Sequence, residues 1–544
     1  MQGLAREDYI VFALYFFVVA FYGYYVYQKK KAKTADSKDF FLAEGSLTWW
    51  AIGASLIASN ISAEHFIGMS GSGFALGLAI STYEWMGAAT LIIVAVVFIP
   101  YYLKNKIYTM PQFLATRYND GVSTTMAVFW LFVYVLVNLT SILYLGALAI
   151  SAISGLSFVV CIWGLAVFAI ILTIGGMKVI GYTDVIQVAV LIFGGLVTTW
   201  LALSMLSNKV GTGAGVFEGL SILRSQADTH FHMIFSSDHK YYMDLPGLSV
   251  LIGGMWINNL NYWGCNQYII QRTLGADLPT ARNGILFAAF LKLLIPVIAV
   301  LPGIAMFVMH QQGMFQAEMV DAAGNVKPDH AYPILMNLLG PGLKGLAFAA
   351  LTAAIVASLA GKANSISTIF SLDIVKKYIV KDASEAKLIR IGRWVVIVSL
   401  IIAGFVAPLL STLDQAYQFI QEYVGFISPG VLAIFLLGFF WKRTTSAAAL
   451  AGTLLTIPIS AILKFLPMWT NGAFPDYPFL DRMTITFAII VIIMVIMSLS
   501  KSPQENTIPK LQPLDTNMLR VSTPFAVGSA IIVITLIILY TTFW

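Results

Sequence analysis

The chain has 544 residues, of which 59% are hydrophobic and only 11% charged, and its mean hydropathy is +0.82. This balance excludes a soluble globular protein and is typical of a chain that crosses the membrane many times. The formal net charge of +6 indicates no nucleic-acid partner, because most basic residues fall in loops between apolar stretches, as they do in membrane proteins.

Apolar stretches of roughly 18 residues or more predict an all-α polytopic membrane protein with about fourteen transmembrane helices. In chain order we expect these spans over residues 9–27, 48–72, 76–101, 124–151, 157–174, 181–206, 246–270, 284–310, 343–374, 392–410, 416–440, 446–466, 482–499 and 523–543. Of the 32 Lys and Arg residues, 22 lie in loops on one side, Arg272 among them. Basic loops remain inside, so both termini are predicted to be outside.

The second span carries an unusual density of polar residues, with Ser59, Asn60, Ser62, Glu64 and His65 inside one apolar stretch. Facing lipid, each unpaired polar group would cost several kcal/mol, so these groups must face the protein interior. A second polar patch, NNLNYWG at 258–264, lies five spans later. Interrupted helices at corresponding positions of two five-span halves indicate an inverted-repeat transporter. The alternative is a pair of ordinary interhelical hydrogen-bond patches.

Further polar residues in other spans suggest the substrate. Glu84 and Lys292 are opposite charges in separate spans, and buried charges require partners. Together with His65, Asn138, Asn259 and Gln421, they give a set of donors and acceptors that suits a neutral polyhydroxylated molecule. Tyr262 and Trp263 offer an aromatic face for such a molecule or a means of closing the pocket.

Enzymatic motifs are missing from the sequence. It contains no Walker A loop, no GxSxG elbow, no HExxH and no long segment outside the apolar stretches. We therefore expect no enzyme and no ATP-driven pump. A channel is disfavoured because no repeated ring of filter residues occurs, and a membrane sugar sensor would normally bring a cytoplasmic signalling domain.

The chain resembles the sodium/solute symporter family, in its sodium/glucose cotransporter branch, and most of all the bacterial galactose-transporting members. The resemblance is carried by ASNISAEHFIGMSGSG, TYEWM, VNLTSILYLG, YTDVIQ, NYWGCNQYIIQRTL, FAAFLKLLIP, NSISTIFSLDI, FIQEYVGFISPG and FLLGFFWKRTTS. It implies a LeuT-type core of ten spans in a 5+5 inverted repeat over 47–441, with repeats at about 47–206 and 246–441. A leading span and basic inner loop (1–40) would precede this core, and three accessory spans (442–544) would follow it, in the bacterial inner membrane.

The resemblance also implies roles for individual residues. The sugar-binding positions are Asn60, His65, Glu84, Asn138, Asn259, Lys292 and Gln421, with Tyr262 as the inner aromatic gate. The outer gate would consist of Met69, Tyr83 and Tyr417. Sodium would bind the carbonyls of Ala58, Ile61 and Ala354 and the hydroxyl of Ser358, with Asp184 near the ion exit path.

Four positions depart from the family pattern. His65 replaces the glutamine of bacterial galactose-transporting members, Gly87 a serine that lines the sugar site, and Ala357 the first of two serines in the sodium site. The fourth is Lys362, one helical turn after Ser358. This lysine has three readings: it reaches an inner vestibule, it pairs with Asp184, or its ammonium replaces sodium.

The resulting hypothesis is a secondary-active symporter that couples inward sodium flow to uptake of a neutral hexose of the galactose or glucose type. Sodium is the expected co-transported ion, and we infer no obligatory protein partner. Three alternatives stay open: sodium-coupled uptake of another polyol such as myo-inositol, proton-coupled or sodium-independent sugar transport, and a sugar sensor without transport.

Overall fold

The computed structural model describes residues 4–29, 41, 47–174, 177–321, 324–412, 416–500, 511 and 516–544, apart from the side chains of 27, 29, 178–179, 411–412, 416–419 and 516. These residues form an all-helical structure, in which the β-pairing is limited to an isolated bridge between Val320 and Val326. The fold class predicted from the sequence is therefore confirmed.

The first half of the chain runs through helices that match the first six expected spans. Their bounds are α1 Arg6–Lys29, α3 Trp49–Asn60, η1 Glu64–Met69, α4 Ser70–Leu76, η2 Gly77–Ser81, α5 Thr82–Ile93, η3 Val94–Phe98, α6 Ile99–Lys104, α7 Met110–Arg117, α8 Asp120–Val133, η4 Tyr134–Leu139, α9 Thr140–Ser154, α10 Phe158–Thr173, α11 Met177–Val210, α12 Val216–Gln226 and η5 Asp228–Phe231.

The second half begins with short helices and continues with long ones. Their bounds are α13 Gly247–Ile252, α14 Gly254–Gly264, α15 Gln267–Leu274, α16 Leu278–Gln311, η6 Pro328–His330, α17 Ala331–Asn337, α18 Leu343–Thr368, η7 Ile369–Ile379, α19 Glu385–Val406, η8 Ala407–Thr412, α20 Ala416–Gly425, α21 Ser428–Phe440, α22 Ser446–Trp469, α23 Phe479–Leu499, α24 Thr516–Leu519 and α25 Thr523–Thr542.

Eleven helices in the described part of the chain are long and apolar enough to cross a membrane. The expected number of about fourteen is not confirmed by this measure. The difference lies at three expected spans, where the helices are short: α10 has 16 residues, and the segments 48–72 and 246–270 are each divided into shorter helices. Division of the last two is what their polar patches predict, because a helix that lines a polar site gives up part of its regular backbone.

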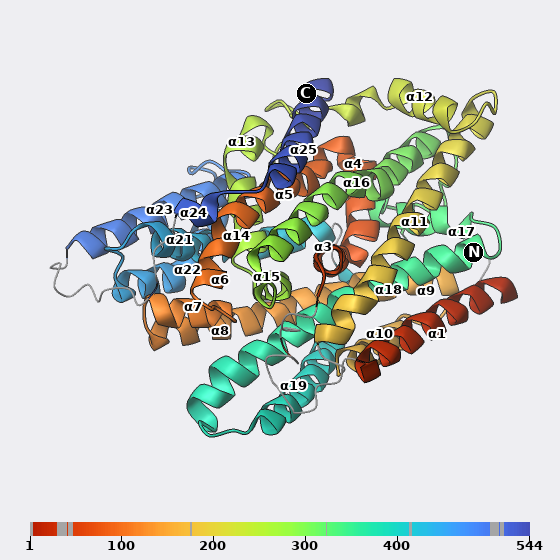
Figure 1. Ribbon diagram of the computed structural model, residues 1–544. Helices are drawn as coiled ribbons and strands as arrows, with labels where there is room; N and C mark the ends of the chain where they lie inside the picture. The colour runs from red at the N-terminus through yellow and green to blue at the C-terminus, as the bar shows by residue number, and fades with distance from the viewer. Residues whose placement is uncertain are drawn as a thin grey trace.

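The helices that carry the polar patches lie at the centre of the molecule. Helix α3 packs against α16, α11 and α18, and all ten of its residues from Ala51 to Asn60 are buried. Gly53 permits the close approach to α16, because a Cβ there would come within 2.6 Å of the Gly284 carbonyl oxygen. Helix α1 packs on α18 and α11 at one side, whereas α21, α22 and α23 pack together at the other (Figure 1).

Candidate functional site

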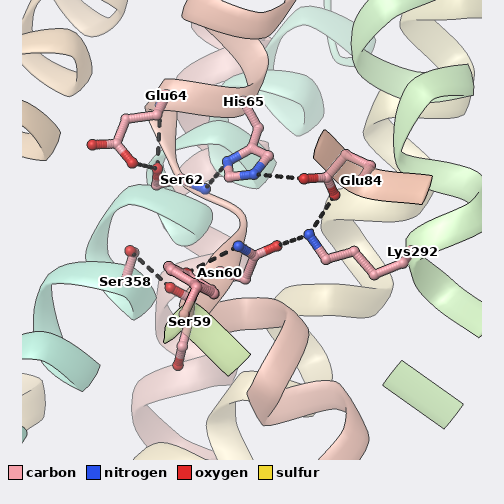
Figure 2. Close-up of polar contacts among 9 residues, drawn as sticks. Ser59, Asn60, Ser62, Glu64, His65, Glu84, Lys292 and Ser358 are labelled. Carbon is pink, nitrogen blue, oxygen red and sulfur yellow. Dashed lines mark hydrogen bonds and ion pairs between the residues drawn. The ribbon is translucent and has the colours of Figure 1, made fainter. Parts of the chain in front are cut away.

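The centre of the site is the interruption between α3 and η1. Helix α3 ends at Asn60, and Ile61 has extended backbone angles (φ −75°, ψ 121°), which ends the regular helical hydrogen bonding. The backbone carbonyls at this end need other partners. Ser358 of α18 supplies one, because its hydroxyl donates a hydrogen bond to the Ser59 carbonyl oxygen at 3.1 Å (Figure 2).

A buried charge pair lies directly beside this interruption. The Lys292 ammonium of α16 donates to Glu84 Oε2 of α5 at 2.6 Å and to Asn60 Oδ1 at 2.5 Å. Both charged side chains are almost completely buried. A buried charge is tolerated when it is paired and its remaining protons are hydrogen-bonded. The pair predicted from the sequence is therefore present, and together with Asn60 it joins α3, α5 and α16.

His65 completes the other side of the Glu84 carboxylate. Its Nδ1 accepts a hydrogen bond from the Ser62 backbone N–H at 3.4 Å, and its Nε2 lies 3.3 Å from Glu84 Oε1 (Figure 2). Because Nδ1 is an acceptor, a neutral imidazole carries its proton on Nε2 and donates it to Glu84. The carboxylate is thus held by a histidine on one oxygen and a lysine on the other.

These residues line one common cavity. All eight residues expected to bind substrate line it: Asn60, His65, Glu84, Asn138, Asn259, Tyr262, Lys292 and Gln421. Two carboxylates (Glu64, Glu84) and two ammonium groups (Lys292, Lys362) are among its walls, so its formal charges balance with His65 neutral.

Only some of the residues expected to act as gates line the cavity. Tyr83, Tyr262 and Trp263 line the cavity. The Tyr262 hydroxyl accepts a hydrogen bond from Asn60 Nδ2 at 3.0 Å. Met69 is fully buried in η1 and is not among the lining residues, while the side chain of Tyr417 lies outside the described residues.

The residues expected to hold sodium gather at the α3 interruption. Ala58 and Ile61 belong to the interrupted end of α3, and Ala354 and Ser358 are one turn apart on α18, which packs against it. Carbonyl and hydroxyl oxygens are the ligands that suit a hard monovalent cation, so this donor set fits sodium. Ala357 has a methyl group at the position expected from the resemblance to carry a second hydroxyl, so Ser358 is the expected hydroxyl ligand.

Lys362 has a different neighbour from the one predicted. Among the residues that the structure describes, no ion pair joins Lys362 to Asp184. Asp184 instead lies 3.9 Å from the Arg272 guanidinium and accepts a hydrogen bond from Ser55 at 2.5 Å. Arg272 is 1% exposed and belongs to α15, so it lies in a helix and not in a loop as expected.

The Lys362 ammonium lies 5.2 Å from the centre of the Tyr268 ring, within reach of a cation–π interaction. Glu64 lines the same cavity as Lys362. Glu64 in turn accepts hydrogen bonds from Ser62 at 3.2 Å and from Ser141 at 2.6 Å. Lys362 is 3% exposed and lines the cavity together with Glu64.

Sequence reasoning gave Glu64 no role, and it passed over Ser141, Tyr268 and Tyr134 entirely. Tyr134 and Tyr268 line the same cavity, and their rings meet edge to face with centroids 5.6 Å apart. The signal for Glu64 was available, because a carboxylate within a membrane span is by default a candidate functional residue with a partner to be found. The two tyrosines gave no such signal, since aromatic residues are common in apolar spans.

Comparison with known proteins places this geometry in a family. The family model described as the sodium:solute symporter family matches residues 40–456. The "Sodium/glucose cotransporter" of Vibrio parahaemolyticus is 47% identical over 550 residues, covering 100% of this chain and 99% of that protein. The human "Sodium/myo-inositol cotransporter 2" is 33% identical, covering 87% of this chain and 72% of that protein.

Among solved structures, an outward-open Na+-coupled sialic acid symporter with bound substrate superposes with a TM-score of 0.77 at 22% identity, over 92% of this chain and 99% of the other. At that identity the likeness establishes the fold, a LeuT-type arrangement. The chain therefore belongs to the sodium:solute symporter family and is a multi-pass membrane transport protein.

Proposed function

We propose that this protein is a secondary-active symporter that couples inward sodium flow to uptake of a neutral hexose of the galactose or glucose type. The observation that carries the proposal is the Lys292–Glu84 pair, held by Asn60 and His65 within a cavity of balanced charge. A neutral substrate leaves that balance undisturbed, and its hydroxyls both donate and accept hydrogen bonds, as the lining amides and charged groups require.

Asn60, His65, Glu84, Asn138, Asn259, Lys292 and Gln421 would contact the sugar, and Tyr262 would close the site from the inside. The name of the Vibrio relative, 47% identical over its full length, supports glucose-type substrates. Relatives named for myo-inositol are more distant, at 31–33% identity, which supports a cyclic polyol as the second candidate.

Sodium would bind between Ala58 and Ile61 of α3 and Ala354 and Ser358 of α18. A membrane potential of about 100 mV supplies roughly 2.3 kcal/mol per charge, and a tenfold sodium gradient adds about 1.4 kcal/mol. One sodium ion per sugar is therefore sufficient for accumulation of several hundredfold. The protein would lie in the bacterial inner membrane with both termini outside, as its basic inner loops favour.

The experiment that tests the substrate is uptake into proteoliposomes under an inward sodium gradient, with radiolabelled galactose, glucose, myo-inositol and a neutral amino acid. We expect one or both hexoses to accumulate and the amino acid to stay at the level of empty liposomes. Accumulation of myo-inositol alone would replace the hexose with the second candidate. Binding without accumulation of any of these compounds would instead support a sensor.

A further inference from the structure

Helix α20 is divided from α21 within the segment that lines the cavity. Gln421 of α20 lines the cavity, and the helix ends at Gly425 before α21 begins at Ser428. The division leaves the Phe426 carbonyl outside both helices. Two hydroxyls of α22 satisfy it: Thr456 donates at 3.0 Å and Ser460 at 3.2 Å.

Glu422, the residue after Gln421, is held by the accessory helices. One oxygen of its carboxylate lies 2.8 Å from the Lys464 ammonium of α22, and the other is paired with the Arg482 guanidinium of α23. Lys464 also lies 4.5 Å from the centre of the Tyr423 ring. Successive residues on a helix point about 100° apart, so Gln421 can line the cavity while Glu422 faces α22 and α23.

The contacts from α22 form one continuous stripe. Thr456, Ser460 and Lys464 are spaced four residues apart, so they lie on the same face of that helix. From α23, Met483 approaches Gly425 so closely that a Cβ there would lie 2.9 Å from its sulfur. The accessory helices thus contact α20 at its charged residue, at its last glycine and at the carbonyl that follows it.

We propose that Glu422 is a positioning residue, which holds α20 against α22 and α23 so that Gln421 faces the substrate. The side chains of Glu422, Lys464 and Arg482 are 12–20% exposed, and partly buried ion pairs that share one carboxylate contribute more than isolated surface pairs. The role assigned to Gln421 rests on the proposed sugar transport, whereas the attachment of α20 to the accessory helices does not.

Hydrogen–deuterium exchange tests the attachment without any substrate. In purified full-length protein in lipid nanodiscs, Glu422→Gln is expected to speed amide exchange in peptides covering 416–427 at least about threefold, with peptides of α21 and α23 unchanged. Asp476→Asn is the matched control, because Asp476 also pairs with Arg482, at 3.3 Å, but is 61% exposed. Unchanged exchange in Glu422→Gln, or equal changes in both variants, would overturn the proposal.

Sodium-driven sugar uptake then tests the positioning of Gln421. We expect Glu422→Gln and Lys464→Gln each to raise the half-saturating sugar concentration about fivefold, with the maximal rate within about twofold and the double variant no worse than the poorer single one. Faster exchange with an unchanged half-saturating concentration would show that Glu422 does not position Gln421; absence of wild-type transport would refute the proposed function and leave the exchange result standing.

Discussion

The two lysines in the cavity wall are held in different ways. Lys292 has direct hydrogen bonds to a carboxylate and an amide oxygen, at 2.6 and 2.5 Å. Lys362 lies over the Tyr268 ring, and Glu64, a carboxylate in the same cavity wall, accepts hydrogen bonds from two serine hydroxyls. We therefore expect the first ammonium to form part of the binding surface and the second mainly to balance charge. Loss of the first should affect the sugar, and loss of the second the ion.

The largest effect is expected from removing the negative charge of Glu84, the partner of Lys292. Glu84→Gln leaves the Lys292 ammonium buried without its counter-charge, and breaking a buried pair typically costs about 3–5 kcal/mol. We expect sugar uptake to fall at least about 100-fold, while the protein still reaches the membrane. Uptake per milligram of membrane-inserted protein is the measurement, and Asp476→Asn serves as a control. Retention of more than a tenth of wild-type uptake would show that the pair does not contact the substrate.

Tyr262 contacts residues next to both lysines, Asn60 beside Lys292 and Tyr268 beside Lys362. Its hydroxyl accepts from Asn60 on the Lys292 side, and its ring lies 5.6 Å from Tyr268, beneath Lys362. If the ring carries the contact with the sugar, Tyr262→Ala should lose about 30-fold in uptake efficiency and Tyr262→Phe no more than about threefold. Equal losses in the two variants would assign the role to the hydroxyl instead.

Lys362→Met should have a smaller and more selective effect. Removing one charge near the proposed ion site, at nearly constant side-chain volume, is expected to shift the half-saturating sodium concentration about fivefold. The half-saturating sugar concentration should stay within about twofold. Sodium titrations of uptake at fixed sugar, and sugar titrations at fixed sodium, separate the two quantities. If the sugar value moves more than the sodium value, the two lysines do not divide their roles as the geometry indicates.

The smallest effect is expected at Gly87, beside Lys292. A Cβ there would lie 3.1 Å from Asn259 Oδ1 and 3.2 Å from Trp263 Nε1, so the neighbours must shift by a few tenths of an ångström. Gly87→Ser adds a hydroxyl to the cavity wall at the position where the family pattern has one. We expect the ratio of galactose to glucose uptake to change about threefold, with total expression unchanged. An unaltered ratio would place Gly87 outside the substrate contact.

Much of the cavity was predictable because intramembrane polar residues need partners. Opposite charges in separate spans predicted the pairing of Lys292 with Glu84, and the density of polar residues at 58–65 predicted the interruption of α3. The second interruption falls at Cys265–Asn266, just after the polar patch at 258–264 and not within it. Its exact position could not be predicted, because side-chain polarity does not determine the residue at which the backbone leaves the helix.

The surroundings of Lys362, which lies over Tyr268 and not beside Asp184, were not predictable in this way. Glu64 and Asp184 are both intramembrane carboxylates, and helical spacing gives no distance between different helices. Asp184 is taken by Arg272, which lies at the end of a short helix where a sequence reading places a loop. Whether Asp184 could pair with Lys362 thus depended on how α15 packs against α3, which is a property of the tertiary structure.

The central claim is that sugar uptake is driven by sodium, and replacement of external sodium by choline at fixed pH tests it most directly. In proteoliposomes with wild-type protein, we expect hexose uptake in choline to fall to the level of protein-free liposomes and to return when sodium is restored. Undiminished uptake in choline would contradict sodium symport and would assign the positive charge at the α3–α18 junction to the Lys362 ammonium.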